Sequence, residues 1–162
     1  MTGTKEQIGT TTPTPALIDH ILTSYHEAHR RDLPNLIELS QRVETVHAND
    51  PNAPHGLSEA LKSLLRDLEE HMSREESVVF FALNARLMGG SEASLAVLRL
   101  DHDRQEAEMD KIAAITHGFW LPAYACRSWT QLYSGLRKLV EDLNEHMILE
   151  NNLLFPRFEN RA

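Results

Sequence analysis

Two stretches of the chain repeat one pattern in register: DLEEHMSREESVVFF (Asp67–Phe81) and DLNEHMILENNLLFP (Asp142–Pro156). Each contains the motif His-x3-Glu, formed in the first stretch by His71 and Glu75. Residues four apart on an α-helix lie on one face, one turn apart, so the imidazole and the carboxylate can point at the same place. Apolar residues surround both copies, and a charge inside a core needs a partner. The repeat therefore predicts that two similar helices contribute to one buried polar site.

The spacing of apolar residues places both stretches on long helices. Apolar side chains recur at alternating steps of three and four, which is the pattern of a helix packed in a bundle. The predicted helices cover roughly residues 16–46, 57–88, 91–117 and 126–152, with turn-forming segments at 47–56 and 118–125 between them. Short connections between four long helices predict an all-α, up-down-up-down four-helix bundle with internal two-fold pseudo-symmetry.

Two features modify this picture. Pro34 lies inside the first apolar stripe, and its missing N–H predicts a kink or a one-turn break near residues 32–35. Residues 1–15 are rich in Thr and Pro and offer little apolar surface to bury, so they are predicted to form a flexible N-terminal tail. The bundle domain is then predicted to comprise residues 16–162.

Composition limits the classes of partner. The chain of 162 residues carries 24 acidic and 16 basic side chains, for a net charge of -8, and no basic stripe that could follow nucleic acid. Cys126 is the single cysteine, which excludes an intrachain disulfide and a two-cysteine metal motif and fits a reducing compartment. The chain has no apolar run of about 18 residues, and its first residues are too polar for a signal peptide. We expect a cytoplasmic protein with no nucleic-acid or membrane partner, and the oligomeric state stays open.

The other two helices also take part in the repeat. His102 follows His26 at nearly the same offset as His146 follows His71, as expected for a duplicated helical hairpin. A two-fold arrangement would aim four imidazoles and two carboxylates into the centre of the bundle. This set suits two metal ions bridged by the two glutamates, with about two octahedral positions left at each ion for an oxo or hydroxo bridge and a small ligand. The candidate metal ligands are His26, His71, Glu75, His102, His146 and Glu150.

Some alternatives stay open at this point. A single His-x3-Glu is usually a surface pair, and it is the two copies in register that favour a metal site. Periodicity does not choose between His26 and His29, because both lie on the apolar stripe. Glu106 forms a third His-x3-Glu with His102 and is an extra ligand, an outer carboxylate or a solvated residue. Asp67 and Asp142, one turn before the motif histidines, either accept an imidazole N–H or lie exposed.

Ligand type restricts the class of metal site without naming the metal. The Glu-x-x-His motif of ferritin-type proteins is absent, since positions 68 and 143 are both Leu. A shell rich in histidine therefore defines a different di-metal class. Histidine and carboxylate ligands suit iron, manganese and zinc nearly alike.

Several segments resemble the hemerythrin-like domain, and most closely the repair-of-iron-centres di-iron proteins. They are LIDHILTSYHEAHRRDLPNLI, RVETVHANDP, EEHMSREESVVF, LDHD and DLNEHMILENNLLFPR, which together extend over nearly all of residues 17–158. The resemblance implies a bacterial non-haem di-iron protein that supports the repair of iron–sulfur clusters damaged by nitric oxide or oxidants. It also implies that His26, the first histidine of YHEAHR, is the ligand of the first helix.

The same resemblance gives the expected partners and two alternatives. The expected ligand is a small diatomic molecule, NO or O2, and iron–sulfur proteins are possible partners. The first alternative is a protein that reversibly binds or senses O2 or NO, and an oxidase or peroxidase ranks last. Members of this family carry an N-terminal module with a pair of cysteines, whereas this chain has no cysteine before Cys126. Whether the protein is an enzyme, and any function that depends on that module, stay open.

Overall fold

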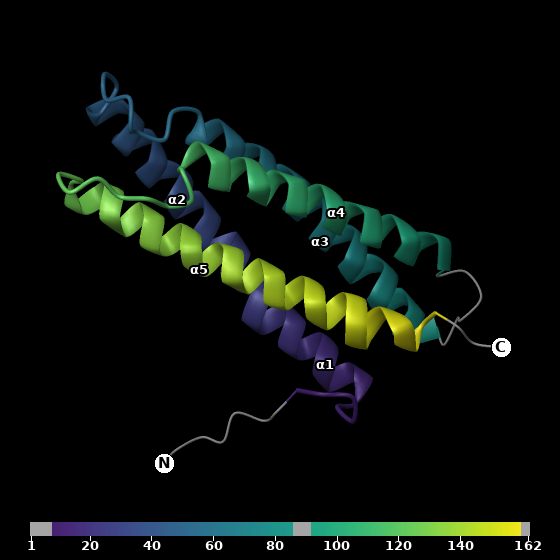
Figure 1. The fold of residues 1–162 in the computed structure, drawn as a ribbon. Helices are drawn as coiled ribbons and strands as arrows, with labels where there is room; N and C mark the ends of the chain where they lie inside the picture. Colours follow the sequence, from purple (N-terminus) through teal and green to yellow (C-terminus); the bar gives the residue numbers. More distant parts are fainter. Residues whose placement is uncertain (1–7, 86–91, 160–162) are drawn as a thin grey trace, which may run out of the picture.

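The computed structural model describes residues 8–85 and 92–159, and within these ranges the chain forms helices and no strands. In chain order they are α1 (Thr14–Ile21), the π-helical segment η1 (Leu22–His26), α2 (Glu27–Val46), α3 (Leu57–Ala85), α4 (Glu92–Ile115), α5 (Arg127–Leu149), the π-helical segment η2 (Glu150–Leu154) and the 3-10 helix η3 (Phe155–Arg157). α1, η1 and α2 follow one another without a gap and form one long rod, and α5 continues directly into η2 (Figure 1). The described residues therefore form four rods, which confirms the predicted all-α four-helix bundle.

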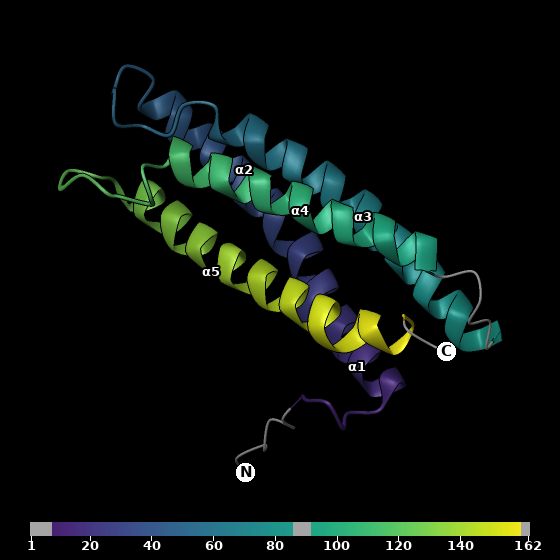
Figure 2. The same cartoon turned by 45° about the vertical axis from the view of Figure 1, so that its right-hand side comes forward.

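The four rods lie side by side and reverse direction at each connection (Figures 1 and 2). The connections formed by residues 47–56 and 116–126 lie at one end of the bundle. α1 and the C-terminal segment η2 lie near the opposite end, where α3 ends and α4 begins. The topology is the predicted up-down-up-down arrangement. The predicted end of the second helix at Met88 and start of the third at residue 91 lie outside the described residues.

The apolar core has two parts. The larger cluster fills the middle of the bundle and the end with the two connections, and it includes the fully buried Trp129, Leu61 and Leu136. The smaller cluster lies near the other end and includes Leu17 and Phe155. Burial of a large apolar side chain contributes about 1.5–3 kcal/mol, so these clusters provide most of the driving force for helix packing. Along the first and third rods a candidate ligand histidine lies between residues of the two clusters, and along the fourth rod Glu150 does.

The one-turn break, one of the two features predicted near residues 32–35, does not occur: α2 is continuous from Glu27 to Val46 with Pro34 inside it. The other, a kink, stays a prediction. The buried side chains of Leu33, Leu36 and Ile37 hold this part of α2 against its neighbours. The side-chain amide of Asn35 also donates to the carbonyl of Arg31. This carbonyl follows directly after the one that would accept from a backbone N–H at position 34, which proline lacks. The irregular turns of the first and last rods are the two π-helical segments instead, where the amides of Glu27 and Phe155 donate to carbonyls five residues earlier.

The first rod begins at Thr14, two residues before the predicted start, with Pro15 in its first turn. Pro is favoured there because the first amides of a helix have no partner within it. Part of the segment predicted to be a tail contacts the bundle: Ile8 packs against the smaller apolar cluster, and Arg157 donates to the carbonyl of Thr10. The division of the chain into a tail and a bundle domain stays a prediction.

No helix in the described part of the chain is long and apolar enough to cross a membrane. The cytoplasmic location expected from the sequence stays a prediction.

Candidate metal centre

The six candidate ligands meet inside the bundle, and all four rods contribute. Each of the six side chains belongs to a residue that is at most 3% exposed. His26 ends η1, His71 and Glu75 lie one turn apart on α3, and the third rod supplies its histidine from the middle of α4. The last rod supplies one histidine from α5 and the glutamate that begins η2. A charged pair of glutamates in such a place needs positive charge beside it.

Their donor atoms form two groups. The first consists of His26 and His146 with both glutamates, and the second of His71 and His102 with the same two glutamates. Within each group, one donor atom from each residue lies within 4.8 Å of the others. The offset between the two copies of the sequence repeat converts the first group into the second, so the predicted pseudo-symmetry is present in the site. Each group combines one histidine from each half of the chain.

The two glutamates reach both groups. Glu75 Oε1 lies 3.0 Å from His26 Nε2, while its Oε2 lies 3.2 Å from His71 Nε2. Glu150 Oε1 lies 2.9 Å from His102 Nε2 and 3.1 Å from His146 Nε2. Each carboxylate thus lies between imidazoles of different groups, as a bridging carboxylate does.

The imidazoles turn their Nε2 atoms toward one another. The Nε2 atoms of His26 and His146 are 3.2 Å apart, and those of His71 and His102 are also 3.2 Å apart. Two lone pairs at this distance repel each other unless a proton or a cation lies between them. Within the described part of the chain, the buried Oε2 atoms of Glu75 and Glu150 have no hydrogen bond of satisfactory geometry. Four imidazole nitrogens and two carboxylates converge here with too few hydrogen atoms to hydrogen-bond to one another. This is the donor set of a transition-metal site.

Three of the four imidazoles are oriented by an acceptor at Nδ1. His26 Nδ1 lies 3.1 Å from Glu76 Oε1, and Arg30 binds the same carboxylate at 2.8 Å. His71 Nδ1 lies 3.1 Å from Asp101 Oδ2. An Nδ1–H donated in this way leaves the Nε2 lone pair free for a metal and fixes the direction of the ring.

The third acceptor also contacts the Nδ1 atom of its imidazole. Asn151 Oδ1 lies 2.8 Å from His102 Nδ1. Sequence reasoning missed these three acceptors, although each directly precedes or follows a candidate ligand in the chain: Glu76 follows Glu75, Asp101 precedes His102 and Asn151 follows Glu150. Each acceptor contacts an imidazole on a rod other than its own. It could therefore be predicted only if the neighbouring rods were known.

His146 is supported differently. Its Nδ1 is buried and has no hydrogen-bond partner among the residues that the structure describes. The ring of Tyr25 stacks on it at 5.3 Å between centroids and 10° between planes, and the ring of His29 stacks at 5.5 Å. Burial, together with His146 and His26, lowers the pKa of His29 to about 3. His29 therefore lies beside the site as a neutral, buried ring, and His26 is the histidine of the first rod that faces the glutamates.

Charge balance also favours a cation at this place. Burial opposes ionisation throughout the cluster, but hydrogen bonds with Glu150 and Glu75 raise the pKa of His71 to about 10. The pKa of Glu150 is held well below its ordinary value, because His146 and the hydrogen bonds around the carboxylate outweigh the effect of burial. These two shifts both favour positive charge beside the glutamates. A divalent ion bound here would displace the imidazole protons and supply positive charge at the same place.

The remaining candidates lie outside the donor groups. Glu106 is exposed, which corresponds to the solvated alternative for the third His-x3-Glu. Asp142 pairs with Lys138 at 2.7 Å, and Asp67 lies beside Glu108. Among the described residues, neither aspartate is the Nδ1 acceptor of a motif histidine, and both are half-buried, so neither of the two alternatives for these residues describes them.

Comparison with known proteins identifies the class. The family described as the hemerythrin HHE cation binding domain matches residues 17–159, and the chain therefore belongs to this family. Among its relatives are proteins named iron-sulfur cluster repair protein YtfE, from Salmonella schwarzengrund (strain CVM19633) and Salmonella newport (strain SL254). Each is 38% identical over 145 residues, which cover 90% of this chain and 66% of the relative. The chain thus matches slightly less than two thirds of the length of these relatives.

Proposed function

We propose that the protein is a non-haem di-iron protein whose six ligands are His26, His71, Glu75, His102, His146 and Glu150. The observation that supports this most directly is the division of the donors into two groups that share both glutamates. Two ions bridged by two carboxylates, each with two imidazoles, would use every donor in the cluster. Bound iron supplies redox chemistry and open coordination positions for a small ligand.

The protein's own side chains would perform the other tasks. The acceptors on Glu76, Asp101 and Asn151 hold three imidazoles with their Nε2 lone pairs inward. The apolar residues on either side keep bulk water away from the donors; Met72 and Met147, which directly follow the motif histidines, are at most 3% exposed. Acceptors of this kind typically change metal affinity about 10- to 100-fold.

We further propose that this centre supports the repair of damaged iron–sulfur clusters, by donating iron or by handling nitric oxide. The name of the Salmonella relatives supports this role, and a di-iron store is chemically suited to it. Iron–sulfur proteins are then the expected partners, and NO or O2 the expected small ligand. The alternative is reversible binding or sensing of NO or O2, which the small apolar pocket beside His26 also favours.

The first experiment is metal analysis of the purified protein together with its visible spectrum before and after anaerobic nitric oxide. We expect about two irons per chain, as the number of donors requires, and a spectrum that nitric oxide changes. No bound iron, even after anaerobic reconstitution with ferrous iron, would refute the di-iron proposal.

A second experiment separates the two functions. The iron-loaded protein is added to an iron–sulfur dehydratase that nitric oxide has inactivated, and the recovery of dehydratase activity is measured. Recovery that exceeds the effect of an equal amount of free ferrous iron supports repair. A stable adduct with nitric oxide or oxygen, with no recovery and no loss of iron on reduction, supports binding or sensing instead.

A further inference from the structure

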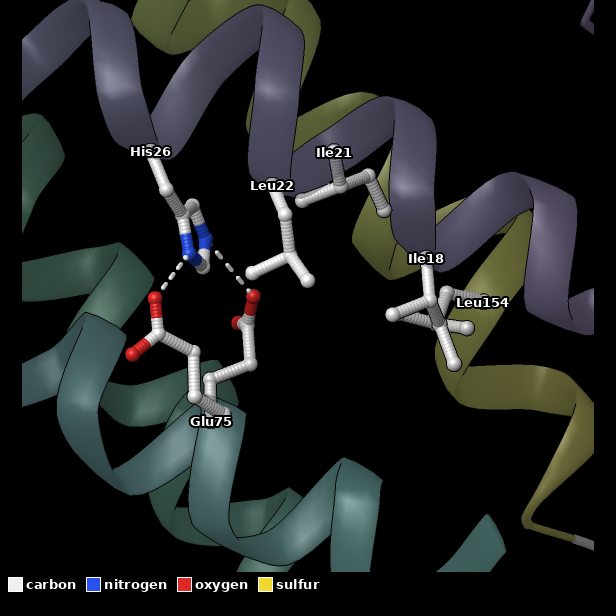
Figure 3. A pocket seen from close by; sticks show the side chains of 7 residues that line it. Ile18, Ile21, Leu22, His26, Glu75 and Leu154 are labelled. Carbon is white, nitrogen blue, oxygen red and sulfur yellow. Dashed lines mark hydrogen bonds and ion pairs between the residues drawn. The ribbon is translucent and has the colours of Figure 1, made fainter.

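Each of the three imidazole acceptors also contacts an arginine, and this arginine comes from the same rod as the imidazole. In the first rod, Arg30 follows His26 by four positions and lies one turn further along the same face. His26 points from this rod toward Glu75 of α3, and dashed lines mark its two contacts with side chains of α3 (Figure 3). The acceptor of its Nδ1 atom is Glu76 Oε1, and Arg30 Nη1 lies 2.8 Å from the same oxygen. The imidazole and the guanidinium thus share one carboxylate oxygen.

The second rod repeats this arrangement toward the third. His71 Nδ1 lies 3.1 Å from Asp101 Oδ2, and Arg74 Nη1 also lies 3.1 Å from that oxygen. Arg74 follows His71 by three positions, so the two side chains leave neighbouring turns of one helix face. The side chain of Asp101 is 11% exposed and that of Arg74 is 41% exposed, so the guanidinium lies on the solvent side of the acceptor.

The third rod has a partial form of this contact. Arg99 precedes His102 by three positions and donates to the main-chain carbonyl of Asn151, the residue whose side chain contacts His102 Nδ1. In the fourth rod, His146 Nδ1 has no hydrogen-bond partner within the described ranges. The arrangement is therefore complete for the imidazoles of the first two rods, and the other two imidazoles provide internal comparisons.

Two physical effects connect these arginines with the imidazoles. An acidic side chain has rotatable bonds, so a half-exposed carboxylate without a partner can turn toward water and leave the imidazole. Arg30 opposes this rotation with a planar fork, whose Nη1 and Nη2 atoms lie 2.8 and 3.3 Å from the two oxygens of Glu76. Its Nε atom lies 2.6 Å from Glu69, which fixes the guanidinium itself. The positive charge of Arg30 also offsets the charge that Glu76 adds beside the buried glutamates.

We propose that Arg30 and Arg74 are positioning residues, which fix the Nδ1 acceptors of His26 and His71 and so keep both imidazoles directed at the shared glutamates. This inference rests on the proposed function for the identity of the centre, and it adds two residues beyond the ligands and their acceptors. Because each arginine contacts the acceptor of one imidazole, its effect should be confined to that imidazole. A contribution to the stability of the whole bundle would affect the imidazoles alike.

The main test measures how fast the Nδ1 protons of His26 and His71 exchange with water. NMR of the zinc-loaded protein is suitable, because zinc is diamagnetic. A proton donated to a buried acceptor that is held in place exchanges slowly. We expect Arg30→Gln to speed exchange at His26 about tenfold or more and to leave His71 within about twofold, since only the acceptor of His26 is released. Arg74→Gln should have the opposite selectivity.

The controls keep this test specific. Arg31→Gln should leave both exchange rates unchanged, since the side chain of Arg31 is 69% exposed and pairs with Asp32 of its own helix. Arg30→Lys should restore part of the slow exchange, because lysine keeps the charge without the planar fork. If Arg30→Gln does not fold, Arg74→Gln tests the second arginine independently. Unchanged exchange at the imidazole whose acceptor is released, or equal acceleration at both imidazoles, would overturn the proposal.

A second measurement shows whether Arg30 acts through Glu76. Zinc affinity is measured by competition with a chelator for Arg30→Gln, Glu76→Ala and the double variant. Arg30→Gln alone should weaken binding several-fold, whereas its addition to Glu76→Ala should change the affinity by less than about twofold. An equal change in both backgrounds would mean that the guanidinium acts by its charge alone and would overturn the proposal. Failure to bind any metal would instead contradict the proposed function, and selective acceleration at His26 in the metal-free Arg30→Gln variant would still support the positioning role.

Discussion

The two groups of donor atoms share both glutamates but differ in what surrounds their histidines. Glu76 and Asn151, which follow the two shared glutamates, are corresponding acceptors for the imidazoles of the first and third rods. Asp101 precedes His102 as Tyr25 precedes His26, but Asp101 accepts from His71, whereas Tyr25 only stacks on His146. The two halves of the repeat thus have the same types of ligand, but different kinds of residue orient the imidazoles. Two metal ions in this site would be equal in ligand type and unequal in environment.

The largest effect is expected from variants that remove a glutamate shared by the two groups. Glu75→Ala and Glu150→Ala each take away a carboxylate that reaches both groups, so each should lower the iron content from about two to below one per chain. Metal analysis of the purified variants measures this. Glu106→Ala is the control, because Glu106 also follows a histidine by four positions but is exposed. Full iron content in both glutamate variants would show that the carboxylates do not bridge.

The next largest effect should distinguish the two groups by how their histidines are supported. Asp101→Ala removes the acceptor of His71 Nδ1 and should weaken metal binding about 10- to 100-fold. Tyr25→Phe keeps a stacking ring and loses only the hydroxyl that donates to Glu145 at 3.3 Å, so its effect on metal binding should be small. Competition with a chelator measures both affinities. Equal losses in the two variants would mean that the support of the two groups does not differ in kind.

A smaller effect is expected from a variant that makes the acceptors of the two groups more alike. Asn151→Asp gives His102 a charged acceptor of the kind that His26 has in Glu76, and this should strengthen binding of the second ion by a few-fold at most. Mössbauer spectra of the iron-loaded protein should then show two iron signals closer together than in the original protein. Asn152→Asp places the same charge at the neighbouring position and serves as the control. Signals that stay equally far apart would place the asymmetry elsewhere.

The smallest effect concerns another pair of corresponding residues, Asp67 and Asp142. Asp142 lies beside Lys138, whereas Asp67 lies beside Glu108, and burial together with Asp67 raises the pKa of Glu108 to about 7. A carboxyl group with a raised pKa in the folded state stabilises the fold below its unfolded pKa, and this stability is lost as the pH rises through about 7.

The Glu108→Gln variant should therefore match the original protein in stability at about pH 4, below the unfolded pKa, and exceed it at about pH 8. The gain should be below about 1 kcal/mol, since Glu108 as a whole is only partly buried and solvent screens part of the interaction. Urea unfolding at the two pH values measures this difference. Glu106→Gln, on the exposed side of the same helix, should show no such dependence on pH, and a gain that is equal at both values would refute the explanation.

Spacing along the chain predicted the rods and the convergent residues of the other three rods, whereas the choice of His26 over His29 came from the family resemblance. The offset of the repeat relates His71 to His146 directly, and the apolar stripes give the face of each helix. The supporting acceptors could not be predicted in this way. Whether His71 meets Asp101 or an aspartate of its own helix depends on which rods are neighbours, and periodicity does not contain that information.

The two errors in the first rod have one origin. Pro34 suggested a break because a proline weakens an isolated helix, but packing of the buried side chains around it outweighs the loss of one hydrogen bond. No residue type marks the π-helical turn that ends at His26, since LTSYH contains neither Gly nor Pro. Tertiary contacts, rather than local preference, decide both places. The metal-binding role of the six residues stays a proposal until metal is measured.

The π-helical segments have a consequence for how the chain can change. Such a turn holds one residue more than a regular α-helix accommodates, so deletion of a single residue within η1 would allow the rod to become regular. Because the wide turn already absorbs the additional residue, α1 and α2 would keep nearly the same faces toward the bundle, and only the side chains within the turn would be redirected. The helix itself would gain regular hydrogen bonds. The wide turn that ends at His26 thus sets the direction of side chains beside the site at the expense of regular helix hydrogen bonds.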